Sequence, residues 1–184
     1  MNSQLAPVNV QGPSRDRRNV QVATSALTPW LATGARLIIG AVFVVAGVLK
    51  VPDPAAAVRA VRDYRLLPES LVAPVAFGLP VVEIAVGLAL LIGVFVRTAA
   101  VAAAVLLVVF LAAVASAWGR GLQIDCGCFG DGGQVAAGET AYPAEILRDT
   151  ALMGLALALA RWPRSRLAVA NRFPAGTEEM SSAR

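Results

Sequence analysis

Long apolar runs alternate with short polar segments along the chain. Three runs, about residues 31–50, 72–96 and 98–118, contain few or no charged residues, and a fourth, about residues 143–161, carries several charges in its first turns. Their lengths approach the roughly 20 residues that an α-helix needs to cross a bilayer core. None shows the period-2 alternation of a half-buried strand, and an open strand cannot satisfy its backbone in lipid, so the pattern predicts four transmembrane helices.

The composition agrees with this pattern, because 57% hydrophobic and 15% charged residues over 184 positions are too apolar for a soluble domain of this length. We therefore predict an all-α fold, an integral membrane four-helix bundle formed by residues 29–162. Residues 1–28 and 163–184 are expected to be disordered cytoplasmic segments. The first run is too long for the core of a cleaved signal peptide, and the sequence shows no nucleotide-binding fingerprint. We expect no nucleic-acid partner.

The first connector, residues 51–70, is too short and too charged to cross the membrane. Val58 and Val61 fall on one side of a helix and Arg59 and Arg62 on another. This amphipathic pattern predicts a short helix at the membrane interface, which would cover the end of the bundle near the third connector. A solvated connector without such a role is the alternative.

Basic residues predict how the bundle lies in the membrane. Four spans put both termini and the second connector on one side, with the first and third connectors on the other. The terminal side carries the larger set: Arg15, Arg17, Arg18, Arg97, Arg161, Arg164, Arg166, Arg172 and Arg184, against Lys50, Arg59, Arg62, Arg65 and Arg120. The positive-inside rule then predicts a multi-pass protein of the cell membrane with cytoplasmic termini and an extracytoplasmic third connector.

The third connector contains both cysteines of the chain, Cys126 and Cys128, on either side of Gly127 in "IDCGCFGDGG". The chain has no histidine, so the ligands for zinc, a Cys-ligated cluster or haem are too few, and we expect no metal. Thiol–disulfide exchange needs only two sulfurs and a partner. A static disulfide or two free thiols are the alternatives, although a bridge this short removes little loop entropy. Asp125 should oppose a thiolate at Cys126, whereas Arg120 should favour one.

The spans also contain charged residues. Glu83 lies near mid-membrane and needs a partner or a proton, and Arg36 and Arg148 are the candidate partners. Asp149 could instead hold Arg148, while Lys50 is expected to extend its amine toward lipid headgroups. These charges would either fix helix register or move protons to a bound electron acceptor such as a quinone, although no cofactor is evident from the sequence itself.

Small residues in the spans have a structural interpretation. We predict that they allow close helix packing rather than bind a ligand. They are Gly40, Gly47, Gly87 and Gly154.

Four segments together resemble the MauE-like membrane proteins, which are related to the broader DoxX group. They are "ARLIIGAVFVVAGVLKVPDP", "YRLLPESLVAPVAFGLPVVEIAVG", "IDCGCFG" and "EILRDTAL", in order within about residues 31–161. The resemblance implies a four-helix membrane protein of extracytoplasmic redox maturation. Its name-giving members belong to methylamine utilisation, where they are thought to assist disulfide formation, processing or transport of the small subunit of methylamine dehydrogenase.

The resemblance also bears on individual residues. Cys126 and Cys128 match the cysteine pair of the family, which implies a redox role for them. Recurring polar positions of the family match Lys50, Glu83, Arg148 and Asp149, for which we infer a supporting role.

Three functional hypotheses follow. In the first, the protein is a membrane thiol–disulfide redox protein whose cysteines exchange with a thioredoxin-like protein or a secreted client. In the second, it is a non-enzymatic assembly or export factor whose disulfide braces a loop. In the third, it transports a small solute with Glu83 as the coupling carboxylate, although the four spans show no inverted repeat.

Overall fold

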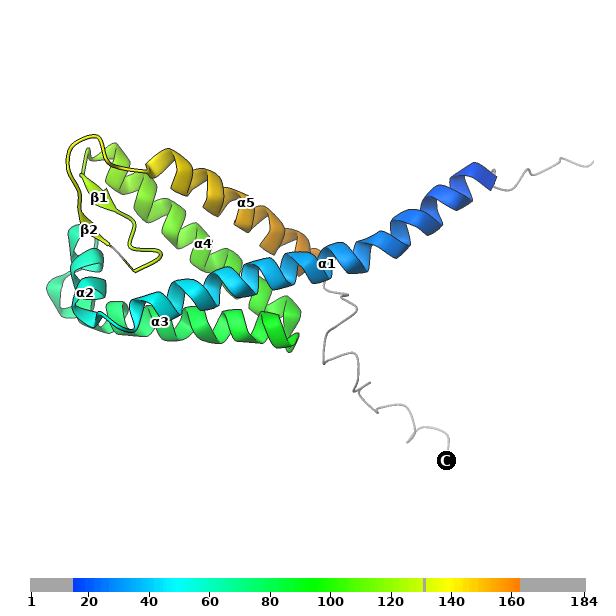
Figure 1. The fold of residues 1–184 in the computed structure, drawn as a ribbon, viewed down its shortest axis with the longest axis horizontal. Helices are drawn as coiled ribbons and strands as arrows, with labels where there is room; N and C mark the ends of the chain where they lie inside the picture. Colours follow the sequence, from blue (N-terminus) through cyan, green and yellow to red (C-terminus); the bar gives the residue numbers. More distant parts are fainter. Residues whose placement is uncertain (1–14, 131, 163–184) are drawn as a thin grey trace, which may run out of the picture.

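The computed structural model describes residues 15–130 and 132–162, with side chains from Trp30 onward (Figure 1). The tail at residues 163–184 and the first part of the N-terminal arm, residues 1–14, lie outside the described residues. The elements in chain order are helices α1 Arg15–Lys50, α2 Pro54–Asp63, α3 Glu69–Ile92 and α4 Val96–Gly119, strands β1 Ile124–Asp125 and β2 Gly133–Gln134, and helix α5 Tyr142–Arg161.

The predicted all-α class is confirmed. Within the described residues, three helical segments are long and apolar enough to cross a membrane: Trp30–Lys50, Glu69–Ile92 and Val96–Gly119. Helix α5 has the predicted position, but its charged first turns set it apart from these three, so its passage through the membrane stays a prediction. The β-structure in the described part of the chain is one antiparallel pair, with Ile124 opposite Gln134.

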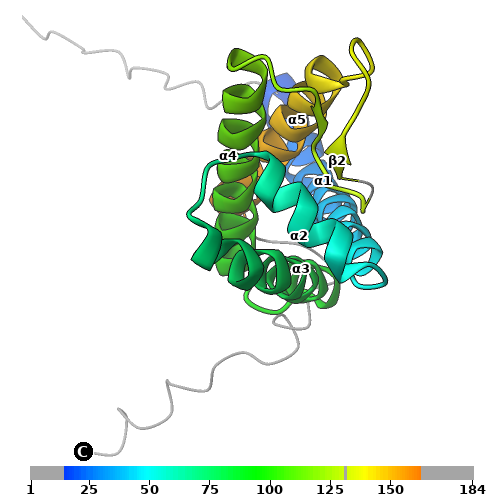
Figure 2. The same ribbon diagram turned by 90° about the vertical axis from the view of Figure 1, so that its left-hand side faces the viewer.

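The four long helices pack side by side, with α1 along α3 and α4 along α5 (Figures 1 and 2). Contacts of α3 with α4 and of α1 with α5 complete the arrangement. The core between them combines large side chains such as Ile39 and Leu90 with alanines such as Ala100, Ala103 and Ala156, all fully buried. These alanines allow close approach of α4 and α5, as small residues do in membrane helix pairs.

Two predicted boundaries differ from the structure. Helix α1 begins at Arg15, so residues 15–28, expected to be disordered, are helical; they contain no glycine or proline that would end a helix. Helix α3 ends at Ile92 rather than near residue 96, because Gly93 adopts the left-handed conformation (φ 81°) and donates its N–H to the carbonyl of Ala89. The turn between α3 and α4 therefore precedes Arg97.

Glycines bring α1 and α3 into contact. A Cβ atom at Gly87 would lie 2.8 Å from the backbone nitrogen of Val44 and 2.8 Å from the carbonyl oxygen of Gly40, and one at Gly47 would lie 2.8 Å from the carbonyl oxygen of Pro80. The packing role predicted for these three glycines is confirmed. The same prediction was wrong for Gly154, whose missing side chain faces open space.

Helix α2 covers the end of the bundle at which the cysteine loop lies (Figure 2). Asp53 starts this helix by accepting a hydrogen bond of 2.8 Å from the Ala56 N–H, and Pro54 occupies its first turn. The predicted short helix is confirmed, and its position at the membrane interface stays a prediction. Its buried residues are Ala56 and Ala60 rather than the valines. At Ala60 the reason is the close approach of the cysteine loop, since a Cβ atom at Gly127 would lie 2.9 Å from that of Ala60 and one at Gly132 would lie closer still.

The glycine contact gives a first prediction. Gly87→Ala should destabilise the protein by about 1–3 kcal/mol, because the new methyl group meets backbone atoms of α1 that cannot move aside independently. Gly78→Ala in the same helix is the matched control, since nothing lies near its missing side chain and alanine favours a helix by up to about 1 kcal/mol. Unfolding in detergent micelles measures both; equal stability of the two variants would contradict the close contact.

Candidate functional site

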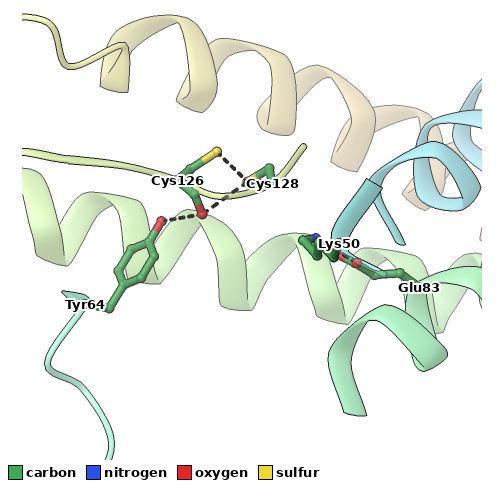
Figure 3. Close-up of polar contacts among 5 residues, drawn as sticks. All are labelled: Lys50, Tyr64, Glu83, Cys126 and Cys128. Atoms are coloured by element: carbon green, nitrogen blue, oxygen red, sulfur yellow. Dashed lines mark hydrogen bonds and ion pairs between the residues drawn. The ribbon is translucent and has the colours of Figure 1, made fainter. Parts of the chain in front are cut away.

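The two cysteines lie in a tight turn directly after β1 (Figure 3). The Asp125 carboxylate accepts a hydrogen bond of 2.9 Å from the Gly127 N–H, and the Cys128 N–H donates to the Cys126 sulfur at 3.2 Å. Gly127 has φ +65°, and a Cβ atom there would lie 2.9 Å from that of Ala60 in α2. Only glycine suits this position, which keeps the two free, partly buried thiols next to each other.

Both tyrosines of the chain anchor this loop. The Tyr64 hydroxyl, just after α2, donates to the Cys126 carbonyl oxygen at 3.2 Å. The Tyr142 hydroxyl, at the start of α5, donates to the Leu122 carbonyl oxygen at 2.7 Å and accepts from the Ile124 N–H at 3.3 Å. Sequence reasoning missed both residues. The available signal was that the chain has only two tyrosines, whose side chains are amphipathic, and that both lie near the loop.

A buried ion pair lies within the bundle near the turn. Lys50 Nζ is 2.7 Å from both carboxylate oxygens of Glu83, and the two side chains are only 8% and 1% exposed. The prediction that Arg36 or Arg148 holds Glu83 was wrong, as was the expected extension of Lys50 toward headgroups. The reason is helix register: α1 and α3 run antiparallel with Gly47 packed on Pro80, and Lys50 and Glu83 each lie about one turn from this contact, on opposite sides of it. Their long side chains point back toward the N-terminus of their own helix, and therefore toward each other.

A second ion pair lies on α5. Arg148 Nε donates to Asp149 Oδ1 at 2.8 Å, which confirms the interpretation that Asp149 holds Arg148. The guanidinium also lies over the ring of Phe129, 4.8 Å from its centroid. Cys128 lines one small cavity together with Glu83, Arg148 and Asp149. The structure thus gathers the predicted supporting residues around one of the two cysteines.

Glu145 is a site residue that sequence reasoning missed. It is 6% exposed, and its Oε2 atom has no hydrogen-bond partner among the described residues. Donor atoms of Asp125, Cys126 and Glu145 lie within 4.8 Å of one another, a set that could hold a cation, and the expectation of no metal stays a prediction. The available signal was spacing, because Glu145 and Asp149 are four residues apart and share one face of α5.

The two thiols are electrostatically unequal. The hydrogen bond between the thiols, together with burial, raises the pKa of Cys126. The same hydrogen bond lowers the pKa of Cys128; burial and the Asp149 carboxylate oppose this shift, and the charges of Arg148 and Lys50 support it. We therefore assign the more readily formed thiolate to Cys128, while Cys126 keeps its proton more strongly.

We expected Arg120 to favour a thiolate at the cysteines. In the structure the guanidinium beside the cysteines is that of Arg148. Arg120 donates to the backbone carbonyls of Ser116 and Tyr64 and thus supports the connector after α2. Burial raises the pKa of Tyr64, so its hydroxyl stays protonated as a donor to the loop.

Comparison with known proteins points to one family. Residues 28–161 match the model of the family "Methylamine utilisation protein MauE". The chain is 38% identical over 138 residues to the methylamine utilization protein MauE of Paracoccus denitrificans, covering 73% of this chain and 70% of the relative. It is 35% identical over 136 residues to the protein of the same name from Methylophilus methylotrophus, with the same coverage. No solved structure matches the chain.

The unequal thiols give a second prediction. Brief treatment of the reduced protein with iodoacetamide at neutral pH should modify Cys128 before Cys126, because the thiolate is the reactive form. Arg148→Gln should slow modification of Cys128 about 3- to 10-fold and move its pH–rate profile to higher pH, as expected for roughly 1 kcal/mol of lost charge interaction.

Arg120→Gln is the matched control, since Arg120 contacts backbone carbonyls and not the sulfurs. Peptide mapping by mass spectrometry identifies the modified cysteine. Preferential modification of Cys126, or equal slowing by both arginine variants, would contradict the assignment.

Proposed function

Because the chain belongs to the MauE family, we propose that this multi-pass membrane protein is a thiol–disulfide oxidoreductase that supports maturation of extracytoplasmic proteins in methylamine utilisation. A suitable client is the small subunit of methylamine dehydrogenase, delivered directly or through a thioredoxin-like protein. The observation that carries the proposal is the pair of adjacent thiols in a hydrogen-bonded turn beside buried charges, which shift the pKa values of the two thiols in opposite directions.

The inequality of the thiols gives the exchange a direction. In the oxidised pair, a client thiolate attacks the Cys126 sulfur, and Cys128 leaves as the stabilised thiolate because the thiol of lower pKa leaves faster. The second client thiolate then attacks the client sulfur of this mixed disulfide and displaces Cys126. Two electrons pass from the client to the cysteine pair, and one client disulfide replaces the Cys126–Cys128 bond.

Glu145 is in a position to accept a proton and return it during this exchange. Its unpartnered carboxylate oxygen is buried beside Cys126, within reach of a thiol that arrives there. It would accept the proton of the first client thiol and return it to the Cys126 sulfur when that sulfur is displaced. The proton of the second client thiol is released to solvent, so the reduced site holds one thiol and one thiolate.

The orientation in the membrane belongs to this proposal. The two connectors that contain α2 and the cysteine loop lie at one end of the bundle, and the turn before Arg97 lies at the other (Figure 1). With cytoplasmic termini, as the positive-inside rule predicts, the cysteines face the extracytoplasmic side. Disulfides form and persist there, which suits oxidation of a secreted client.

The structure gives less support to the two other hypotheses. An assembly factor would use the cysteines to brace the loop, but hydrogen bonds from Tyr64 and Tyr142 and the packing of Ala60 already hold it. A transporter would need Glu83 to bind and release its solute or proton, yet both oxygens of Glu83 are engaged by Lys50.

The direction of exchange gives a third prediction. In cells, Cys128→Ser should accumulate a mixed disulfide between Cys126 and a client: the Cys126 thiolate attacks the disulfide of an oxidised client, whose other sulfur leaves as a thiolate, and no Cys128 is present to attack Cys126 and release the client. Cys126→Ser should accumulate much less, since the sulfur that bonds to the client is gone. Non-reducing electrophoresis followed by mass spectrometry identifies the linked protein, and the double serine variant is the control. If neither single variant accumulates a mixed disulfide, the result would contradict the redox function.

The orientation gives a fourth prediction. A membrane-impermeant maleimide should label the reduced thiols in intact cells. In a chain with both cysteines replaced by serine, Phe95→Cys places a thiol in the exposed turn at the opposite end of the bundle, where labelling should require permeabilisation. The reverse pattern would contradict the extracytoplasmic position of the cysteine loop.

A further inference from the structure

An apolar cavity of about 220 Å³ adjoins the cysteine turn. Cys126, Gly127 and Cys128 form one part of its wall, and Figure 3 shows Tyr64 and Lys50 on opposite sides of that turn. The remaining wall is mainly aliphatic and aromatic and includes Ala57, Val61, Ala76, Leu79, Phe110 and Ala113. The cavity thus joins a hydrophobic space directly to the pair of thiols.

The rim of the cavity is also apolar. Val75 of α3 and Val109 of α4 line it, and their side chains are 37% and 56% exposed. Both helices are apolar enough to cross a membrane, so their exposed valines face lipid. Leu66 and Leu67, in the connector after α2, continue this exposed apolar rim. A molecule dissolved in the bilayer can therefore reach the cavity without passing through water.

One cation is available to a ligand in this cavity. Lys50 Nζ uses two of its three N–H donors on Glu83 and lies 5.9 Å from the centroid of the Phe110 ring, which also lines the cavity. The third N–H can donate to an oxygen of a bound ring. The Tyr64 hydroxyl, by contrast, already donates to the Cys126 carbonyl oxygen.

We propose that this cavity binds the ring of a membrane quinone, which is the electron acceptor of the reduced cysteine pair. This inference rests on the proposed redox function. The ligand has to enter from lipid, fill a small apolar space with an oxygen near a cation, and accept two electrons beside two thiols. A quinone ring satisfies each condition, whereas a phospholipid acyl chain has neither the oxygen nor the electron-accepting capacity.

The reaction balances without a further reagent. The reduced site, with its one thiol and one thiolate, takes one proton from solvent to give a complete dithiol, whose two S–H bonds break as one S–S bond forms. The quinone gains two electrons and two protons, forms two O–H bonds and leaves as the hydroquinone. Lys50 positions and polarises a ring oxygen, and the regenerated disulfide is ready for the next client.

Reconstituted full-length protein tests the inference with ubiquinone-1, whose fully substituted ring resists thiol addition. Reduced protein in lipid nanodiscs should form one ubiquinol per cysteine pair as both thiols disappear. Ala113→Phe, which fills the cavity from α4, should slow ubiquinol formation at least about tenfold, because the ring is excluded. Ala112→Phe is the matched control, since its side chain is exposed and does not line the cavity.

A second pair of variants tests the same cavity independently, in case Ala113→Phe does not fold. Ala57→Leu fills the cavity from α2 and should also slow the reaction, whereas exposed Ala55→Leu should not. Disulfide exchange between each oxidised variant and reduced thioredoxin is measured in parallel, and we expect the cavity variants to retain it.

The two readouts separate the two proposals. Exchange with thioredoxin without ubiquinol formation would overturn the quinone site and leave the redox function standing. Equal rates of ubiquinol formation in the cavity variants and their controls would also overturn the site. Absence of exchange in the wild type would overturn the redox function, and ubiquinol formation that depends on the cavity would still support the quinone site.

Discussion

The ion pair between Lys50 and Glu83 is the interaction around which the site is organised. Two charges withdrawn from both water and headgroups are tolerable only as partners, and removal of one partner from a buried pair typically costs about 3–5 kcal/mol. Because the pair joins the last turn of α1 to the interior of α3, it fixes the register of these helices at the glycine contacts. The same pair places a positive charge near Cys128 and a donor in the apolar cavity.

Elements of the bundle hold the cysteine turn from two sides. Helix α2 presses Ala60 onto Gly127, while the two tyrosines hold the loop backbone through its carbonyl groups. Helix α5 brings Glu145 and Asp149 to the other side, so each cysteine has a different electrostatic neighbourhood. A hydrogen-bonded turn with unequal thiols is suited to directed exchange, because one sulfur is the better target and the other the better leaving group.

The sequence was sufficient to predict the helices, because hydropathy is a local property. It also showed that both cysteines lie in one connector, and their redox role stays a prediction. It was insufficient for the partner of Glu83, which depends on the register of α1 against α3. Lys50, Arg36 and Arg148 all carry a positive charge that can pair with Glu83. Only the packing of the helices shows that Lys50 is the partner.

Other differences have similar causes. The end of α3 was missed because Gly93 stops the helix within an uninterrupted apolar run. Glu145 and the tyrosines act through contacts with residues distant in the chain, so the spacing of Glu145 from Asp149 and the scarcity of tyrosine do not by themselves show which atoms these residues contact. Gly154 shows the reverse case, in which a residue type typical of helix contacts lies where no contact exists.

The proposed function requires that Cys126 and Cys128 form one reversible redox pair. Equilibration of the purified protein with glutathione buffers of graded potential, followed by thiol alkylation and mass determination, measures this directly. We predict a single two-electron transition between a state with two free thiols and a state with an intramolecular Cys126–Cys128 disulfide. Thiols that stay free at every potential, or that form only separate mixed disulfides with glutathione, would contradict the account.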